Sequence, residues 1–207
     1  TAHIYPEQNF AFRHSSGEYA LTIQATMIEP DIAATALMLY HLDYDQTRID
    51  ADIEIEIREA PIRDFVLHLP LDYVLADVST HQLSDFFLSP STDEGINQLR
   101  LVFSGPGIGR HQIQLRLERN TPLAGTEWTL ERVVPQSTRQ LRGHIGITSI
   151  EGYRITPNAA LNLTEISTVY FPKKMDGLQA AFRLTETDWN LTVNATPIPQ
   201  SVQADSF

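Results

Sequence analysis

Acidic residues concentrate between positions 43 and 56 and form the densest group of potential metal ligands in the sequence. They are Asp43, Asp45, Asp50, Asp52, Glu54 and Glu56. Because Ca²⁺ binds carboxylate oxygens, Asp43, Asp45, Asp50 and Asp52 are candidate Ca²⁺ ligands. The EF-hand loop is absent, since Arg48 stands where that loop requires glycine. The alternative interpretation is a solvated strand face whose charges discourage edge-to-edge pairing.

Carboxylate pairs are the machinery of glycoside hydrolysis, and candidates for such a pair are present. They are Glu127, Glu131, Glu165 and Asp188. With 26 acidic residues in the chain, however, some pairs arise by number alone. The sequence therefore leaves a hydrolase open but assigns no catalytic residue.

Other catalytic and cofactor chemistries have no support in the sequence. The seven histidines are scattered without metal-ligand spacing, and the Gly-x-Ser-x-Gly elbow of serine hydrolases is missing. The absence of cysteine excludes thiolate metal sites and cysteine nucleophiles. The prediction is a protein that is not an enzyme and has no cofactor, with Ca²⁺ as the alternative.

Aromatic residues offer a further function, because a flat ring on a strand face can stack on a sugar. The alternating pattern places Trp128 and Trp189 on apolar strand faces, so both are predicted to lie in the core. Tyr153 and Tyr170 are left as the candidate ligand-binding aromatic residues.

Composition limits the classes of partner that the chain is expected to bind. The 207 residues carry 15 Lys and Arg against 26 Asp and Glu, a net charge of −11. Nucleic-acid binding needs clustered basic residues, so it is not expected. The longest apolar run, Ala33 to Leu39, is too short to cross a membrane as a helix.

Alternation of apolar and polar residues is the main signal for the elements that must position these groups. In Ile49 to Arg58 every second residue is apolar, a pattern typical of a strand with one buried face. Further strands are predicted at residues 19–25, 65–69, 99–103, 111–118, 127–133, 144–150, 168–171, 178–184 and 188–193. The glycine-rich stretch from Ser104 to Arg110 is predicted to be a hairpin loop.

These signals predict an all-β protein: one or more antiparallel β-sandwiches of about ten or more short strands, with little or no helix. Residues 31–42 fit either a strand or a helix capped by Asp31.

An internal repeat helps to decide whether residues 31–42 form a strand or a helix. A shift of 170 positions aligns residues 11–37 with residues 181–207 without a gap, and nine of the 27 pairs are identical. The second copy alternates from Ser201 to Asp205, which favours a strand over a helix at residues 31–39. Two strands of similar composition are the alternative explanation of the match.

The repeat also predicts the organisation. The chain begins at Thr1, carries no signal segment and ends where the second copy has barely begun, so we expect a window cut from a longer array. The segments proposed are 1–62, 63–138 and 139–207, the last containing the start of the second copy.

The predicted function is an acidic, non-enzymatic structural, adhesive or spacer module of a longer tandem-repeat protein, located outside the cell or in the cell envelope. Its partners would be neighbouring modules of the same chain, and a protein or a glycan. The alternative is a carbohydrate-binding or other accessory module of a larger secreted enzyme.

Overall fold

The computed structural model describes residues 26–43, 46–91, 95–120, 125–149 and 152–198, and the single residues 13, 15, 17, 20 and 22. Asp45 lies outside the described residues, as does the predicted strand at residues 19–25 apart from residues 20 and 22. Of the 27 aligned repeat pairs, eight have both residues described. The repeat therefore stays a prediction.

The described chain is built almost entirely of strands, as predicted. The strands are β1 (Asp31–Leu42), β2 (Thr47–Pro70), β3 (Val74–Thr80), β4 (Leu83–Pro90), β5 (Ile96–Arg119), β6 (Glu127–Thr129), β7 (Val134–Pro135), β8 (Gln140–Thr148), β9 (Tyr153–Leu161), β10 (Leu163–Ile166), β11 (Leu178–Leu184) and β12 (Asn190–Pro197). The one helical element in these ranges, η1 (Thr168–Tyr170), has three residues, and no helix there could cross a membrane.

The strands form two sheets. The larger has the order β10-β11-β8-β1-β2-β5-β3, with β4 paired to β5 and β7 to β2, and the smaller has the order β6-β12-β9. Strands β1 and β8 are parallel, whereas the other pairs are antiparallel. Antiparallel pairing thus dominates the described strands, as predicted, and the one parallel pair makes the large sheet mixed.

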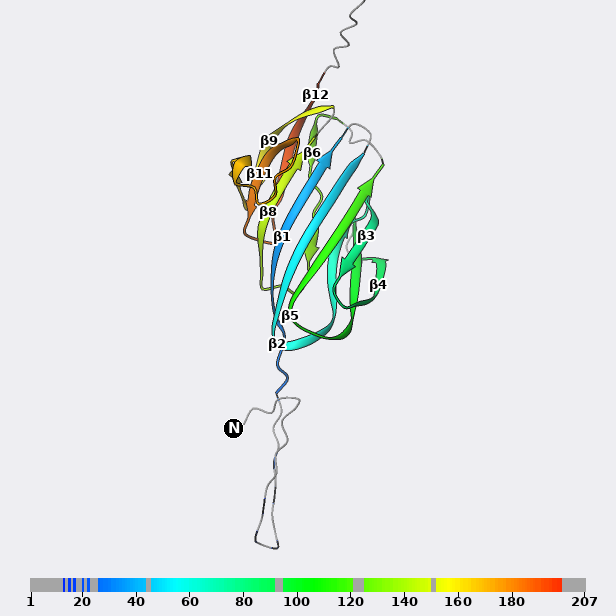
Figure 1. Cartoon of the computed structure of the whole chain (residues 1–207), viewed down its shortest axis with the longest axis vertical. Coiled ribbons are helices and arrows are strands. Elements are labelled where there is room, and N and C mark those ends of the chain that lie inside the picture. Colours follow the sequence, from blue (N-terminus) through cyan, green and yellow to red (C-terminus); the bar gives the residue numbers. More distant parts are fainter. Residues whose placement is uncertain are drawn as a thin grey trace, which may run out of the picture.

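The large sheet bends over on itself along one line. Residues 47–57 of β2 pair with residues 109–119 of β5, and residues 64–70 of β2 pair with residues 96–102, with an interrupted register between the two stretches. Figure 1 shows β2 and β5 turning at the lower end of the molecule. Each strand thus contributes to both layers.

Positive φ angles mark the bend in the strands that cross it. Glu59 in β2 has φ 65°, Gln82 between β3 and β4 has φ 65°, and Gly109 in β5 has φ 84°. The stretch from Ser104 to Arg110 is therefore a bend inside β5, and the predicted hairpin loop was wrong. Glycine and proline allowed the change of direction there, but the chain does not reverse.

The main hydrophobic core fills the space between the two layers, and a second, smaller cluster is formed by Leu39, Phe171 and Ala181. The alternating residues from Ile49 to Ile57 are at most 2% exposed, and they share one hydrophobic cluster with Leu67 and Leu99 from beyond the bend. Trp128 and Trp189 of the smaller sheet region belong to the same cluster, which confirms that they are core residues.

Two other predicted elements differ from the structure. Residues 168–171 form η1 and its end instead of a strand, and the predicted strand at residues 127–133 stops at Thr129. In contrast, residues 31–42 form β1, so the preference for a strand over a helix was right.

The parallel contact of β1 with β8 requires a glycine at position 143. A Cβ there would lie 1.7 Å from the backbone oxygen of Ala36, and the Gly143 φ of 146° is one that other residues rarely adopt. No side chain can be accommodated without moving one of the two strands.

We therefore expect Gly143→Ala to lower the free energy of unfolding by about 2 kcal/mol or more, because steric overlap and backbone strain add. Gly105→Ala is the matched control, since a Cβ there meets nothing within 4 Å. Urea unfolding of both variants measures the difference. Equal midpoints would contradict the close β1–β8 contact.

Candidate functional site

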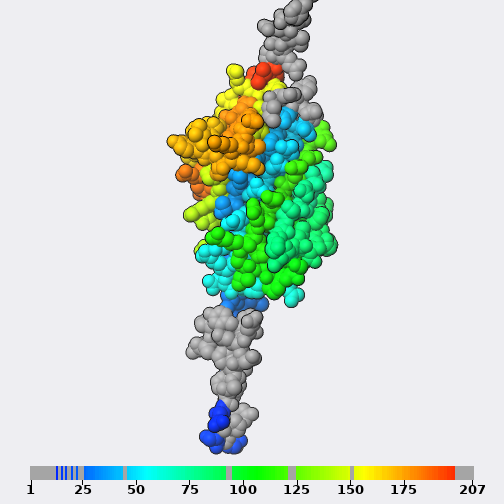
Figure 2. Space-filling model, in the orientation of Figure 1, coloured from blue at the N-terminus to red at the C-terminus, as the bar shows by residue number. Residues whose placement is uncertain are grey.

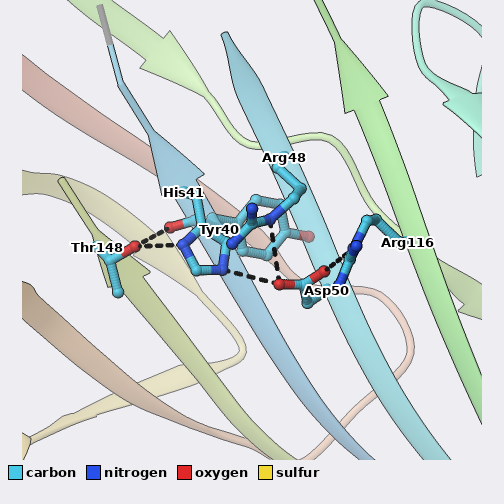
Figure 3. Close-up of polar contacts among 6 residues, drawn as sticks. All are labelled: Tyr40, His41, Arg48, Asp50, Arg116 and Thr148. Carbon is cyan, nitrogen blue, oxygen red and sulfur yellow. Dashed lines mark hydrogen bonds and ion pairs between the residues drawn. The ribbon is translucent and has the colours of Figure 1, made fainter. Parts of the chain in front are cut away.

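One residue of the predicted acidic stretch, Asp50, lies at the centre of a network of polar contacts (Figure 3). His41 Nε2 lies 3.0 Å from Asp50 Oδ2, Arg48 Nε lies 3.2 Å from the same oxygen, and Arg116 Nε lies 3.2 Å from Oδ1. On its other side, His41 Nδ1 lies 2.8 Å from the hydroxyl of Thr148. The network joins β8, β1, β2 and β5.

Strand register explains why these residues meet. Arg116 of β5 lies directly opposite Asp50, and Arg48 lies opposite His41. Residues directly opposite one another in antiparallel strands have neighbouring side chains, so opposite charges there attract. Thr148 joins the network because β8 pairs with β1 in parallel and places it opposite His41.

The Asp50 carboxyl responds to these neighbours. Burial alone would raise its pKa, but the hydrogen bond from His41, the charge of Arg48 and the hydrogen bond from Arg116 outweigh that effect. Together they lower the pKa of Asp50 from 3.8 to about 2. The carboxylate is therefore charged throughout the physiological range and holds the strands around it together.

Thr148, His41 and Asp50 follow one another in the order of a nucleophile, a base and an orienting acid. Unlike the nucleophile and the base of a catalytic triad, however, Thr148 and His41 are not accessible to a substrate. Thr148 is 1% exposed and His41 is 6% exposed, so a substrate cannot reach the hydroxyl. The geometry fits a structural role, in which the Thr148 hydroxyl satisfies a buried imidazole nitrogen.

The predicted Ca²⁺ ligands are not brought together around an empty position. Asp50 is engaged with His41, Arg48 and Arg116, and Asp45 lies outside the described residues. Within the described part of the chain, no group of three or more potential ligands is close enough to hold a metal ion. A Ca²⁺ site here stays a prediction.

Two of the four candidate catalytic carboxylates share a surface hollow of about 550 Å³. Glu131 and Asp188 line it together with Asp72. The Asp188 side chain is 82% exposed and forms an ion pair of 2.9 Å with Arg132. Glu131 is exposed as well, so the two carboxylates lie on an open surface.

The other two carboxylates lie apart from that hollow. Glu127 on β6 accepts a hydrogen bond of 2.9 Å from the side-chain amide of Asn158, and Glu165 lies exposed on β10. No catalytic constellation is found among the described residues. Sequence reasoning singled out these acids by residue type, which says nothing about burial.

The two candidate aromatic residues have different environments. Tyr153 packs edge-on against Trp128 with a ring-centroid distance of 4.9 Å, and it belongs to the border of the core. Tyr170 on η1 is 77% exposed and lies beside Val169, which is 85% exposed. Only Tyr170 therefore presents most of its ring to a ligand.

Sequence reasoning missed Thr148 and Arg116 in the polar network. Arg116 could have been found from the predicted strand faces, because its strand alternates charged with apolar residues as the Asp50 strand does. Thr148 had no such signal, since it is 107 positions from His41 and looks like any strand threonine.

Comparison with known proteins shows little relation by sequence. No protein-family model matches the chain, and no curated protein matches it either. Among solved structures, an M1 zinc metallopeptidase from Deinococcus radiodurans is similar at 10% identity with a TM-score of 0.46, over 80% of this chain and 42% of the other.

Leukotriene A4 hydrolase from Saccharomyces cerevisiae is similar at 7% identity with a TM-score of 0.48, over 80% of this chain and 29% of the other. This chain thus spans less than half the length of either structure. At these scores, the similarities support no conclusion about activity.

The Asp50 network predicts that the free energy of unfolding depends on pH. Because the pKa of Asp50 is lower in the folded state, its stabilisation is present above pH 3.8 and is lost as the pH falls through about 2. At neutral pH we expect Asp50→Asn to lower the free energy of unfolding by about 1–2 kcal/mol. That deficit shrinks as the pH is lowered.

Asp52→Asn is the matched control, since Asp52 lies on the same strand face and forms no ion pair with any residue that the structure describes. Urea titrations of the two variants at neutral and acidic pH make the comparison. A deficit of Asp50→Asn that stays constant as the pH falls would exclude the carboxylate as its source.

Proposed function

We propose that this chain forms a non-catalytic β module that acts as a structural, adhesive or spacer unit of a longer, exported tandem-repeat protein. The observation that carries the proposal is the position at which the chain enters and leaves the folded module. The residues that lead into β1 lie at the lower end of the molecule, and the last strand, β12, reaches the upper end (Figures 1 and 2).

An entry and an exit at opposite ends suit end-to-end connection of modules. The strand β1 runs for 12 residues along the long axis, a length of about 40 Å. If the 170-residue period continues, residue 201 takes the place of Asp31, and residues 198–200 separate β12 from the next first strand. So short a connection would leave successive modules little freedom to fold back.

The environments of the candidate catalytic groups also support a non-catalytic role. The triad-like residues Thr148 and His41 are buried, and Asp188 in the hollow is committed to Arg132. These groups stabilise strands and loops, and none of them is placed to attack or to protonate a substrate.

A tandem chain tests the proposal. A second copy of residues 38–207 appended after Phe207 continues the 170-residue period, so we expect two folded units in line. The maximum dimension from small-angle X-ray scattering should then exceed that of the 207-residue chain by about 40 Å or more.

The 207-residue chain itself is the control, measured under the same conditions. A second unit that fails to fold, seen as half the expected unfolding amplitude, would contradict the repeat. Two folded units in a compact side-by-side arrangement would contradict the spacer function.

A carbohydrate-binding or other accessory module of a larger secreted enzyme is the second candidate function. The observation that favours it is the exposed ring of Tyr170 next to Val169 on η1. Exposed aromatic rings bind sugars by stacking on their apolar faces.

If this function is correct, glycan-array binding by the chain should be lost on Tyr170→Ala. Val74→Ala is a suitable control, because Val74 is 71% exposed but lies on β3, at the opposite edge of the large sheet from β10. Binding that survives Tyr170→Ala, or no binding to any glycan by the unaltered chain, would exclude this site.

A further inference from the structure

A hollow of about 530 Å³ opens on the outer face of the large sheet, over β1, β8 and β11. Its polar lining consists of Thr35, Gln140, Arg142, His144, Arg183 and Thr185. No carboxylate lines it, although the chain as a whole carries a net charge of −11. A basic hollow is therefore unusual on this molecule.

The strand register brings the three basic side chains together. Arg142 and His144 are two residues apart on β8, so they point to the same face of the sheet. Arg183 of β11 lies directly opposite His144, one strand spacing away, or about 5 Å. Thr35 of β1 lies beside Arg142 in the parallel register.

The two arginines are exposed, and neither has a carboxylate partner within 4.0 Å among the described residues. Most other arginines of the outer face differ: Arg48, Arg110 and Arg116 all form ion pairs. The charges in the hollow are thus available to a ligand.

Neighbouring groups hold the basic side chains in place. With its amide oxygen turned toward Arg142, Gln140 accepts two hydrogen bonds of 2.8 Å from the guanidinium. The His144 ring packs edge-on against Phe171 at 6.3 Å. Burial and the charge of Arg183 lower the pKa of His144, so its neutral ring can donate or accept a hydrogen bond at neutral pH.

The nearest acidic column of the same face is separated from the hollow. Glu54 and Asp52 of β2 lie opposite Thr35 and Leu37 of β1, so an uncharged stretch of β1 stands between them and the arginines. The outer face therefore has a basic part and an acidic part, about two strand spacings or 10 Å apart.

We propose that this hollow binds an anionic group, a carboxylate, sulfate or phosphate, between Arg142 and Arg183. The guanidinium forks match the oxygens of such groups. His144, Thr35 and Thr185 supply further hydrogen bonds. The ligand group comes either from a free anionic molecule or from the Asp52 and Glu54 carboxylates of a second copy of this chain.

Titration with sodium sulfate at constant ionic strength, followed by amide chemical shifts of the full chain, tests the site. We expect saturable shifts at β8 and β11 in the unaltered protein. The double variant Arg142→Gln, Arg183→Gln should weaken binding by about tenfold or more. The control Arg63→Gln, Arg154→Gln removes two other exposed arginines and should bind like the unaltered protein.

Sedimentation at low salt separates the two sources. Self-association abolished both by Arg142→Gln, Arg183→Gln and by Asp52→Asn, Glu54→Gln supports a second copy as the source. Sulfate binding without self-association supports a free anionic ligand. The proposal is overturned if the shifts do not saturate, or if the Arg142, Arg183 variant, folded by its urea midpoint, binds sulfate as tightly as the control.

Discussion

The antiparallel pairing of β2 with β5 is the interaction on which the rest of the structure depends. Both strands are 24 residues long, and they pair on both sides of the bend. Because each strand belongs to both layers, the position of the bend decides which residues face one another across the core. Glu59, Gln82 and Gly109, the positive-φ residues of the bend, let neighbouring strands turn at one line.

The outer face of the large sheet has a clear division of charge. The first part of β2 carries acidic residues, which are partly neutralised by arginines on β5. In contrast, Arg142 of β8 and Arg183 of β11 have no carboxylate partner among the described residues. Asp50 connects its own strand β2 to β1 and β5 through His41 and Arg116. Stabilising contacts and available charges thus occupy different strands of one face.

Much of this architecture could be predicted from local patterns. The exceptions depend on information that local patterns do not contain. Alternation identified the buried face from Ile49 to Ile57, because a half-buried strand must alternate. It failed at Ser104 to Arg110, since glycine and proline mark a change of direction but do not tell a bend from a reversal. The contact of His41 with Thr148 depends on the parallel pairing of β1 with β8, which no local pattern contains.

The distance between the two ends of the module tests the central claim most directly. The chain has no cysteine, so Met27→Cys and Ile198→Cys introduce two unique sites for spin labels at exposed positions next to β1 and β12. An entry and an exit at opposite ends predict a pulsed electron-resonance distance longer than about 40 Å, the length of β1. A distance below about half that value would place both ends together and contradict an in-line module.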